Sequence, residues 1–176
     1  MEELVDILNE NGEKIGVVEK SEAHKRGLWH RVVHIWILNS NRQLLIQKRS
    51  KQKSFYPNVW DVSVGGHVGA GENAVDASLR EVFEEIGVSL SAKDLEFLFS
   101  FADQIEYNGV LVNEIADVFL VEKDIDLSKL KLQKEEVSDA KWISLNDFFA
   151  QCFTSKFLPH TKGYEKLAVW FDKNVL

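Results

Sequence analysis

Short apolar runs separated by turn residues recur through the first 121 residues, and this pattern predicts strands joined by loops. The first two runs flank the polar loop 9–13 and predict an N-terminal β-hairpin. A short helix capped by Ser21 is expected to follow and to end near Gly27. The expected strands cover residues 3–8, 14–19, 32–38, 44–48, 60–64, 95–102, 110–121 and 139–144.

Longer helices are expected over residues 72–86, 145–152 and 163–174. Gly87 is expected to end the first of them, because glycine readily adopts the left-handed conformation found after helix C-termini. The last has apolar residues at positions 164, 167, 168, 170 and 171, which is typical of an amphipathic helix. Strands and helices mix without regular β-α-β alternation, so we predict an α/β fold with a mixed sheet.

The composition is that of an ordinary globular protein. Hydrophobic residues make up 45% and charged residues 28% of 176 residues, a length close to that of one domain. The net charge of −7, from 21 basic and 28 acidic residues, provides no basic stripe for a nucleic-acid polymer, so no such partner is expected. Bound cations can still attract a phosphate-bearing small molecule to an acidic protein.

The cysteine content and the length of the apolar runs favour a cytoplasmic location. Cys152 is the only cysteine, which excludes an internal disulfide. The acidic start at residues 1–6 contains no long apolar run, so no signal peptide is expected. No segment approaches the roughly 20 apolar residues of a membrane-spanning helix, so no membrane association is expected.

Three glutamates share one face of the predicted helix 72–86. On a wheel with about 100° per residue, Glu81, Glu84 and Glu85 lie together. The opposite arc, predicted to be buried, contains Val75, Leu79, Val82, Phe83 and Ile86. Like charges at these spacings repel by roughly 0.2–0.5 kcal/mol per pair on an isolated helix. A hard cation such as Mg²⁺ would relieve that repulsion, and a solvated acidic face is the alternative interpretation.

A glycine-rich loop, residues 65–71, precedes this helix. Its glycines at positions 65, 66, 69 and 71 allow positive φ angles and a close approach of the backbone to a ligand. Glycine-rich turns and helix N-termini present free N–H groups that suit phosphate oxygens. The loop and the glutamate face together therefore favour a phosphate and cation site over a solvated surface.

Residues 66–88 match a known motif. They consist of Gly66, five residues, Glu72, seven residues and then Arg80-Glu81-Val82-Phe83-Glu84-Glu85-Ile86-Gly87-Val88. This arrangement resembles the Nudix box at every specified position. The resemblance implies a Nudix-type α/β/α sandwich with a mixed β-sheet and a loop–helix–loop catalytic motif.

The resemblance also implies an activity, the hydrolysis of a diphosphate linkage with Mg²⁺, or alternatively Mn²⁺, as cofactor. Glu81, Glu84 and Glu85 would bind the metal, and one of them would orient or deprotonate the attacking water. The predicted catalytic residues are Glu84, Glu81 and Arg80, with Arg80 holding the carboxylates in place. Glu72 would support the start of the helix. Which glutamate acts as the base varies within the family and stays open.

The predicted domain organisation is a single Nudix hydrolase domain over residues 1–176. The N-terminal hairpin and short helix occupy residues 1–28, the Nudix box residues 66–88 and the C-terminal helix residues 160–174. The expected partner is a small-molecule diphosphate. A homodimer is expected only because dimers are the commonest closed assembly.

Predicted phosphate contacts are Gly66, His67 and Arg49. Arg49 ends an apolar strand, and its guanidinium offers planar bidentate donors, although an exposed strand-end charge is the alternative. Aromatic side chains near these residues either stack a base and line a pocket or belong to the core. They are Phe55, Tyr56, Trp60 and Phe101.

A second resemblance extends over roughly residues 4–150. The N-terminal hairpin, the segment 44–49 and Asn113-Glu114, among other positions, are together similar to isopentenyl-diphosphate isomerase, which is built on the Nudix fold. That isomerase binds a metal through three histidines and two glutamates. The matching positions are His24, His30, His67 and Glu114. They predict a second metal site, and ordinary surface or hydrogen-bonded histidines are the alternative.

Two departures disfavour the isomerase reaction itself. The isomerase moves protons with a cysteine and a glutamate, but the matching positions here are Gly65 and Val112. Without the thiol, one of the two proton-transfer groups is missing. Cys152 lies far along the chain. Hydrolysis is therefore the prediction, with isomerisation and a non-catalytic nucleotide-sensing domain as alternatives.

Several other residues have weaker signals. Glu114 is either a further metal ligand or a strand-edge charge, and for Glu135 and Glu136 a solvated loop is favoured. His34 is predicted to be structural, and His160 has no evident role. No complete motif for coenzyme A, NADH or ADP-ribose is present. The predicted substrate is therefore a nucleoside diphosphate linked to another moiety, or a related small molecule.

Overall fold

The computed structural model describes residues 3–9 and 11–174. Residues 1–2, 10 and 175–176 lie outside the described residues, and with them parts of the acidic start, the first loop and the predicted domain range. The strands are β1 (Leu4–Leu8), β2 (Lys14–Glu19), β3 (His30–Leu38), β4 (Gln43–Arg49), β5 (Trp60–Asp61), β6 (Val64–His67), β7 (Glu96–Tyr107), β8 (Val110–Glu122) and β9 (Val137–Ser144). The α-helices are α1 (Lys20–Arg26), α2 (Ala74–Ile86), α3 (Leu145–Gln151) and α4 (Thr161–Asn174), with 3-10 turns at Ala92–Asp94 and Leu127–Lys129.

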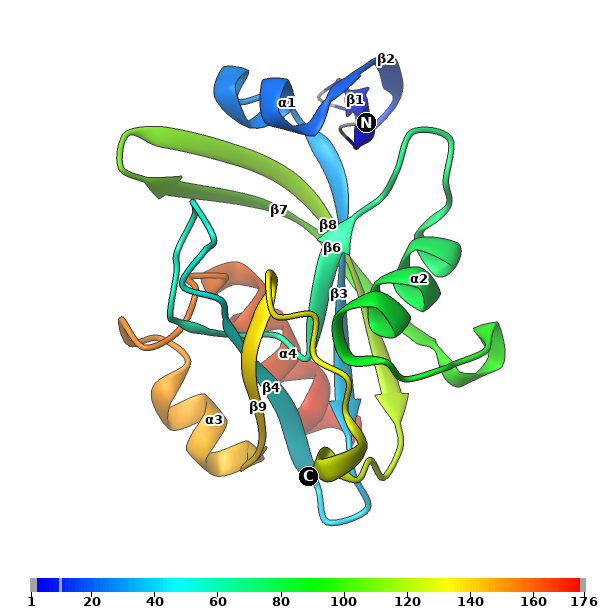
Figure 1. Cartoon of the computed structure of the whole chain (residues 1–176), viewed down its shortest axis with the longest axis vertical. Helices are drawn as coiled ribbons and strands as arrows, with labels where there is room; N and C mark the ends of the chain where they lie inside the picture. Colours follow the sequence, from blue (N-terminus) through cyan, green and yellow to red (C-terminus); the bar gives the residue numbers. More distant parts are fainter. Residues whose placement is uncertain (1–2, 10, 175–176) are drawn as a thin grey trace.

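The strands form one mixed sheet whose two halves diverge (Figure 1). In one half, β3 pairs in parallel with β8 along its whole length and antiparallel with β6, and β8 pairs with β7. In the other half, β4 pairs antiparallel with β5 and β9. In the described residues, β3 and β4 pair only at Leu38 and Leu44. The divergence from that point leaves room for a cavity between the halves.

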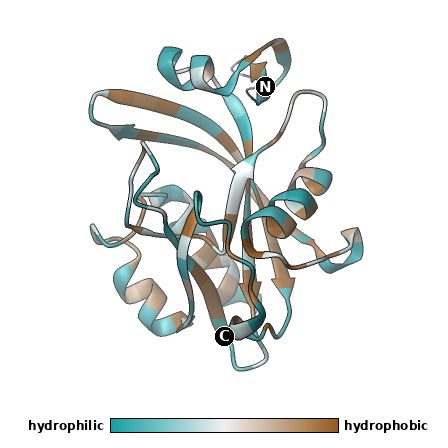
Figure 2. Cartoon of the chain, in the orientation of Figure 1, coloured by the Kyte–Doolittle hydropathy of each residue, from teal (hydrophilic) through white to brown (hydrophobic). Residues whose placement is uncertain are grey.

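Helices cover both faces of the sheet, as an α/β/α sandwich requires. Alternate residues of β3 point to opposite faces. Val33 and Ile35 pack in the cluster that contains Val82 of α2, whereas Val32 and Trp36 pack in the cluster of α3 and α4. Figure 2 shows hydrophobic residues along the strands and hydrophilic residues on the outer helix surfaces. The predicted fold class is confirmed.

Some local predictions are corrected. The helix α1 begins at Lys20 with Glu19 as its N-cap residue, so Ser21 is not the cap, because β2 runs directly into the helix. The expected strand 60–64 is divided into β5 and β6. The division falls at Ser63, whose hydroxyl donates to the carbonyl of Leu45 and accepts the N–H of Ile37.

Strand β7 extends five residues beyond the predicted end at residue 102. Its buried positions there alternate as Phe101, Asp103 and Ile105, and the buried aspartate conceals the apolar pattern in the sequence. Within residues 3–9 and 11–174, no helix combines the length and apolar character needed to cross a membrane.

Candidate active site

The glycine loop and the glutamate helix lie where the sequence predicts them. Strand β6 leads through loop 68–73 into α2, whose first turn is capped by the Asn73 side chain accepting the Asp76 N–H at 2.9 Å. Because Asn73 is the N-cap, α2 starts at Ala74 rather than at residue 72. Gly87 ends the helix with a φ of 72°, as expected.

Gly66 and Glu81 are in close contact. A Cβ atom at position 66 would lie 2.0 Å from Cδ of Glu81, so only glycine leaves room for this carboxylate. Burial raises the pKa of Glu81 to about 7, against the opposing effect of the Arg80 charge. The Nudix-box glycine thus has a steric role, since it lets the carboxylate lie directly over the strand backbone.

Arg80 donates hydrogen bonds to five acceptor oxygens that belong to four residues. Its Nε and Nη2 donate to the two carboxylate oxygens of Glu72 at 3.0 and 2.9 Å, a bidentate pair. Its Nη1 donates to Glu81 at 2.8 Å and to Glu84 at 3.2 Å. Nη2 also donates to the His67 carbonyl at 3.0 Å. Arg80 therefore fixes the loop end, the helix start and two of the three glutamates relative to one another.

The prediction that all three glutamates lie opposite the buried face is wrong. Glu81 and Glu85 are 9% and 5% exposed, whereas Phe83, predicted to be buried, is 60% exposed. The buried arc of α2 is rotated toward the glutamates because hydrogen bonds from Arg80 and Gln47 compensate these carboxylates for lost water. Of the three, only Glu84 is exposed.

Glu81 and Glu85 form a buried acidic pair suited to a divalent cation. Glu85 accepts a hydrogen bond from Gln47 Nε2 at 3.0 Å. Burial, and next the charge of Glu81, raise the pKa of Glu85 to about 8. Neighbouring carboxylates that resist ionisation are stabilised when a hard cation binds between them. The donor set therefore fits Mg²⁺ or Mn²⁺.

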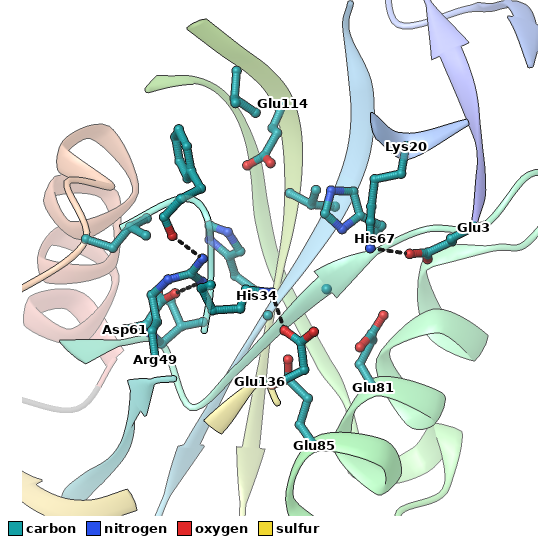
Figure 3. Close-up of a pocket in the computed structure, with 18 of the residues that line it drawn as sticks. Glu3, Lys20, His34, Arg49, Asp61, His67, Glu81, Glu85, Glu114 and Glu136 are labelled. Carbon is teal, nitrogen blue, oxygen red and sulfur yellow. Dashed lines mark hydrogen bonds and ion pairs between the residues drawn. The ribbon is translucent and has the colours of Figure 1, made fainter. Parts of the chain in front are cut away.

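These groups line one cavity of about 610 Å³. Figure 3 shows Glu81 and Glu85 on one side, Arg49 and Asp61 on the other, and Glu114 above them. Of the two loop glutamates considered in the sequence, Glu136 lines the cavity and is paired with Lys53, while Glu135 is exposed and lies outside it.

The second predicted metal set is also brought together. Ligand atoms of His24, His30, His67 and Glu114 all lie within 4.8 Å of one another. Nε2 of His24 is 3.0 Å from Nε2 of His67. Nδ1 of His30 hydrogen bonds to the Leu28 carbonyl at 2.9 Å. The buried Nε2 of His30 has no hydrogen-bond partner among the described residues and lies 3.7 Å from a carboxylate oxygen of Glu114. An orphaned imidazole nitrogen beside two others and a carboxylate fits a transition-metal ion.

The electrostatics of this histidine set agree with a metal site. Burial lowers the pKa of His24 to about 4 and lowers the pKa of His30 and His67 as well. The rings are therefore neutral at pH 7, which is the form that binds a metal. Burial raises the pKa of Glu114 to about 7.

At the other end of the cavity, Arg49 is engaged by the protein. Its Nε and Nη2 donate to the carbonyls of Tyr56 and Phe55 at 2.9 and 2.8 Å, and Nη1 donates to Asp61 at 3.1 Å. Arg49 thereby holds the 50–59 loop against the cavity. Direct contact between Arg49 and a phosphate stays a prediction.

His160, to which the sequence assigned no role, is buried in the cavity wall. Its Nδ1 lies 2.6 Å from Asp103 and its Nε2 lies 3.2 Å from Asp61. Burial opposes protonation, but the two carboxylates outweigh it and raise the pKa of His160 to about 9. A histidine in a proline-containing loop gives no sequence signal for such long-range pairing.

Two lysines at the cavity have no role assigned from the sequence, although Lys20 is one of the positions that resemble the isomerase. Nζ of Lys20 lies 2.7 Å from Glu3, and Lys53 is paired with Glu136. Both lysines line the cavity, and Lys20 lies near His67 (Figure 3). A single lysine at a helix start or in a loop has no distinguishing pattern in one sequence, so only the fold shows that both side chains line the cavity.

A comparison with family models decides the classification. The model described as the NUDIX domain matches residues 28–171. The chain belongs to the Nudix family. That match contains the whole of the Nudix box and all the strands from β3 onward.

Similar proteins confirm both resemblances found in the sequence. The chain is 37% identical over 156 residues to a Nudix hydrolase of Listeria monocytogenes, covering 88% of each. It is 39% identical over 170 residues to Nudix hydrolase 3 of Arabidopsis thaliana, covering 93% of this chain but only 22% of that longer protein. It is 33% identical over 135 residues to an isopentenyl-diphosphate Delta-isomerase of Cereibacter sphaeroides, covering 74% of this chain and 72% of the isomerase. The crystal structure of DR0079 from Deinococcus radiodurans superposes with a TM-score of 0.75 at 26% identity, covering 93% and 98% of the two chains.

Within this Nudix fold, the two positions that depart from the isomerase both lie in or beside the cavity. Gly65 pairs with His34 across β6 and β3, and Val112 pairs with Ile105 across β8 and β7. Both Gly65 and Val112 line the cavity, so neither position offers a proton-transfer group there. Cys152 is buried in the core cluster of α3 and α4.

Proposed function

We propose that this Nudix protein, acting as a single domain, hydrolyses a diphosphate linkage with Mg²⁺ or Mn²⁺ as cofactor. The predicted substrates are nucleoside diphosphates linked to another moiety and related small molecules. The observation that carries the proposal is the buried pair Glu81 and Glu85, held over Gly66 and fixed by Arg80 and Gln47. Burying two neighbouring carboxylates away from water costs free energy, and a bound cation with its phosphate ligand explains why the cavity contains them.

In the proposed mechanism, Glu81, Glu84 and Glu85 would hold the metal ion. When bound, the ion supplies charge neutralisation of the diphosphate and lowers the pKa of the attacking water. Glu81 or Glu84 accepts the proton of that water, and Arg80, which donates to both, keeps their oxygens in position.

Cationic side chains and the loop backbone would bind the phosphates. Gly66 and His67 present their backbone beside the carboxylates, and Arg49 lies across the cavity. Lys20 and Lys53 lie at the same cavity, and both are already paired with glutamates that a phosphate could displace.

The set His24, His30, His67 and Glu114 would hold a second metal ion. Two observations support this second site: Nε2 of His30 has no hydrogen-bond partner among the described residues, and the four ligand atoms all lie within 4.8 Å of one another. This ion would add positive charge at the phosphate end of the cavity. Its chemistry differs from that of the glutamate pair, because imidazole favours ions such as zinc over magnesium.

A panel of diphosphate compounds tests the proposal. Purified protein is incubated with nucleoside diphosphate derivatives, dinucleotides and alkyl diphosphates, with Mg²⁺ or with a chelator, and the phosphomonoester products are quantified by ion-exchange chromatography. We expect metal-dependent release from at least one class and none in the chelator. Tight binding of a nucleotide without any release would instead support the sensing alternative.

The isomerase alternative needs its own measurement. Isopentenyl diphosphate is incubated with the protein and followed by proton NMR. With Gly65 and Val112 in place of the two proton-transfer groups, no allylic product is expected. Formation of the allylic isomer would replace the hydrolase proposal.

A further inference from the structure

One end of the cavity, the inner compartment around His34 and His160, lies on the face of β3 that is opposite to α2. His34 follows Val32 in the alternation of β3 and so points toward the α3 and α4 side, where its ring centroid is 4.4 Å from that of His160 and 5.8 Å from that of Phe101. The glutamates of α2 lie on the other side of β6, and both ends belong to one cavity. A ligand held by the glutamates can therefore extend into the inner compartment.

Four charged groups of this compartment neutralise one another, and Glu114, whose charge interacts with all four of them, adjoins them in the cavity wall. His160 is bound between Asp103 and Asp61, at 2.6 and 3.2 Å, and Asp61 also accepts from Arg49 at 3.1 Å. Their hydrogen-bonding capacity is directed at each other rather than at the cavity. Among the described residues of this compartment, no cation is therefore left unpaired for a ligand.

His34 is the exception. It is 5% exposed and lines the cavity, yet among the described residues neither of its ring nitrogens has a hydrogen-bond partner. Polar side chains that are buried to this degree are normally paired. Burial, with the nearby charge of His160, lowers the pKa of His34 to about 3. A neutral imidazole provides one donor and one acceptor.

The remaining walls are mostly apolar. They are formed by Val62, Ile105, Val112, Leu158 and the ring of Phe55. Gly65, across from His34, adds no side chain. The surroundings of the free imidazole thus suit an uncharged group with mostly apolar surface and a polar atom.

We propose that this inner compartment binds the uncharged, non-phosphate moiety of the substrate and that His34 is the residue that hydrogen bonds to it. The proposal rests on the proposed function, because it takes the glutamate end to be the diphosphate site. His160 acts as a positioning residue, since its ring packs on that of His34 and is itself fixed by two aspartates.

Steady-state kinetics on a matched pair of probes test the proposal. Uridine diphosphate carries an uncharged nucleoside, whereas methyl diphosphate is too short to reach beyond the phosphate end. For His34→Phe we expect kcat/KM on uridine diphosphate to fall roughly three- to tenfold, mainly through KM, the range of one lost neutral hydrogen bond. For the same variant we expect kcat/KM on methyl diphosphate to stay within about twofold of the wild-type value. His34→Gln keeps a donor and an acceptor, so its kcat/KM on uridine diphosphate should lie between those of His34→Phe and wild type. An equal loss on both probes, or no loss on either, overturns the proposal.

An NMR measurement separates this proposal from the hydrolase proposal. Wild-type protein labelled with ¹⁵N at histidine is titrated, in Mg²⁺, with uridine diphosphate and with inorganic diphosphate. The His34 signal is assigned as the one that is missing from the spectrum of folded His34→Phe or His34→Gln protein. We expect uridine diphosphate, and not inorganic diphosphate, to shift the ring-nitrogen signals of His34. That result without any hydrolysis would contradict the proposed function alone. An unchanged His34 signal in uridine diphosphate, or the same shift with both ligands, overturns the inference.

Discussion

Gly66 and Glu81 fit together so closely that a single added carbon at position 66 would overlap the Glu81 carboxylate, at 2.0 Å from its Cδ atom. Gly66→Ala is therefore expected to displace Glu81 and to lower Mg²⁺-dependent hydrolysis by about two orders of magnitude, the scale set by loss of a positioned catalytic group. Gly16→Ala is the matched control, because a Cβ there would meet nothing within 4 Å. Equal activity of the two variants would contradict the steric role of Gly66.

Arg80 is expected to need its guanidinium shape as well as its charge. Arg80→Lys keeps the charge but cannot maintain the bidentate pair with Glu72 and the bond to Glu81 together. We expect kcat to fall about ten- to a hundredfold. Arg26→Lys, at an exposed ion pair on α1, is the control for the same substitution. A full-activity Arg80→Lys enzyme would show that charge alone suffices.

The histidine set is expected to retain an ion independently of the glutamate pair. After purification with Zn²⁺ or Mn²⁺ and extensive dialysis, elemental analysis should find about one equivalent in wild type and in Glu85→Gln. In His30→Gln the retained metal should fall by at least about tenfold. Loss of the ion from Glu85→Gln, or its retention in His30→Gln, would place the tightly bound metal elsewhere.

The pairing of His160 with two aspartates predicts a pH-dependent contribution to stability. The pKa of His160 is raised from 6.5 to about 9 in the folded protein. This stabilisation is fully present below pH 6.5 and is lost as the pH rises through 9, because the folded protein then gives up the proton that it held more tightly than the unfolded chain.

The measurement compares the free energies of unfolding of wild type and His160→Gln at pH 6 and pH 9.5. We expect the difference between the two proteins to shrink by on the order of 2 kcal/mol at the higher pH. His34→Gln, beside it, serves as a control with no protonated state to lose in this range. A difference that is constant across the range would mean that His160 is not held protonated between the aspartates.

The parts of the fold that the sequence predicts are those encoded locally. The strand runs, Gly87 as a helix stop and the spacing of the Nudix box depend on residues close together in the chain, and the structure and the family comparison agree with them. The burial of Glu81 and Glu85 could not be predicted from the wheel, because hydrophobicity does not show that Arg80 and Gln47 compensate the two carboxylates.

Contacts made over long sequence separations could not be predicted either. His160 and Asp103 are 57 residues apart, and nothing near either residue indicates the other. The histidine set was accessible only through the resemblance to the isomerase, which aligns distant positions that one sequence alone leaves unrelated. Phe55, one of four aromatic residues considered, lines the cavity, whereas Phe101 is buried in the core and Trp60 packs against it.

The most direct test of the central claim compares Mg²⁺-dependent hydrolysis by wild type, Glu85→Gln and Glu135→Gln on the best substrate of the panel. Glu85 is buried in the cavity beside Glu81, whereas Glu135 is exposed outside it, so the same substitution probes the metal site and a neutral surface. We predict that Glu85→Gln loses at least about a hundredfold in kcat and that Glu135→Gln keeps the wild-type rate. A wild-type rate in Glu85→Gln would contradict the assignment of the α2 glutamates as the catalytic metal site.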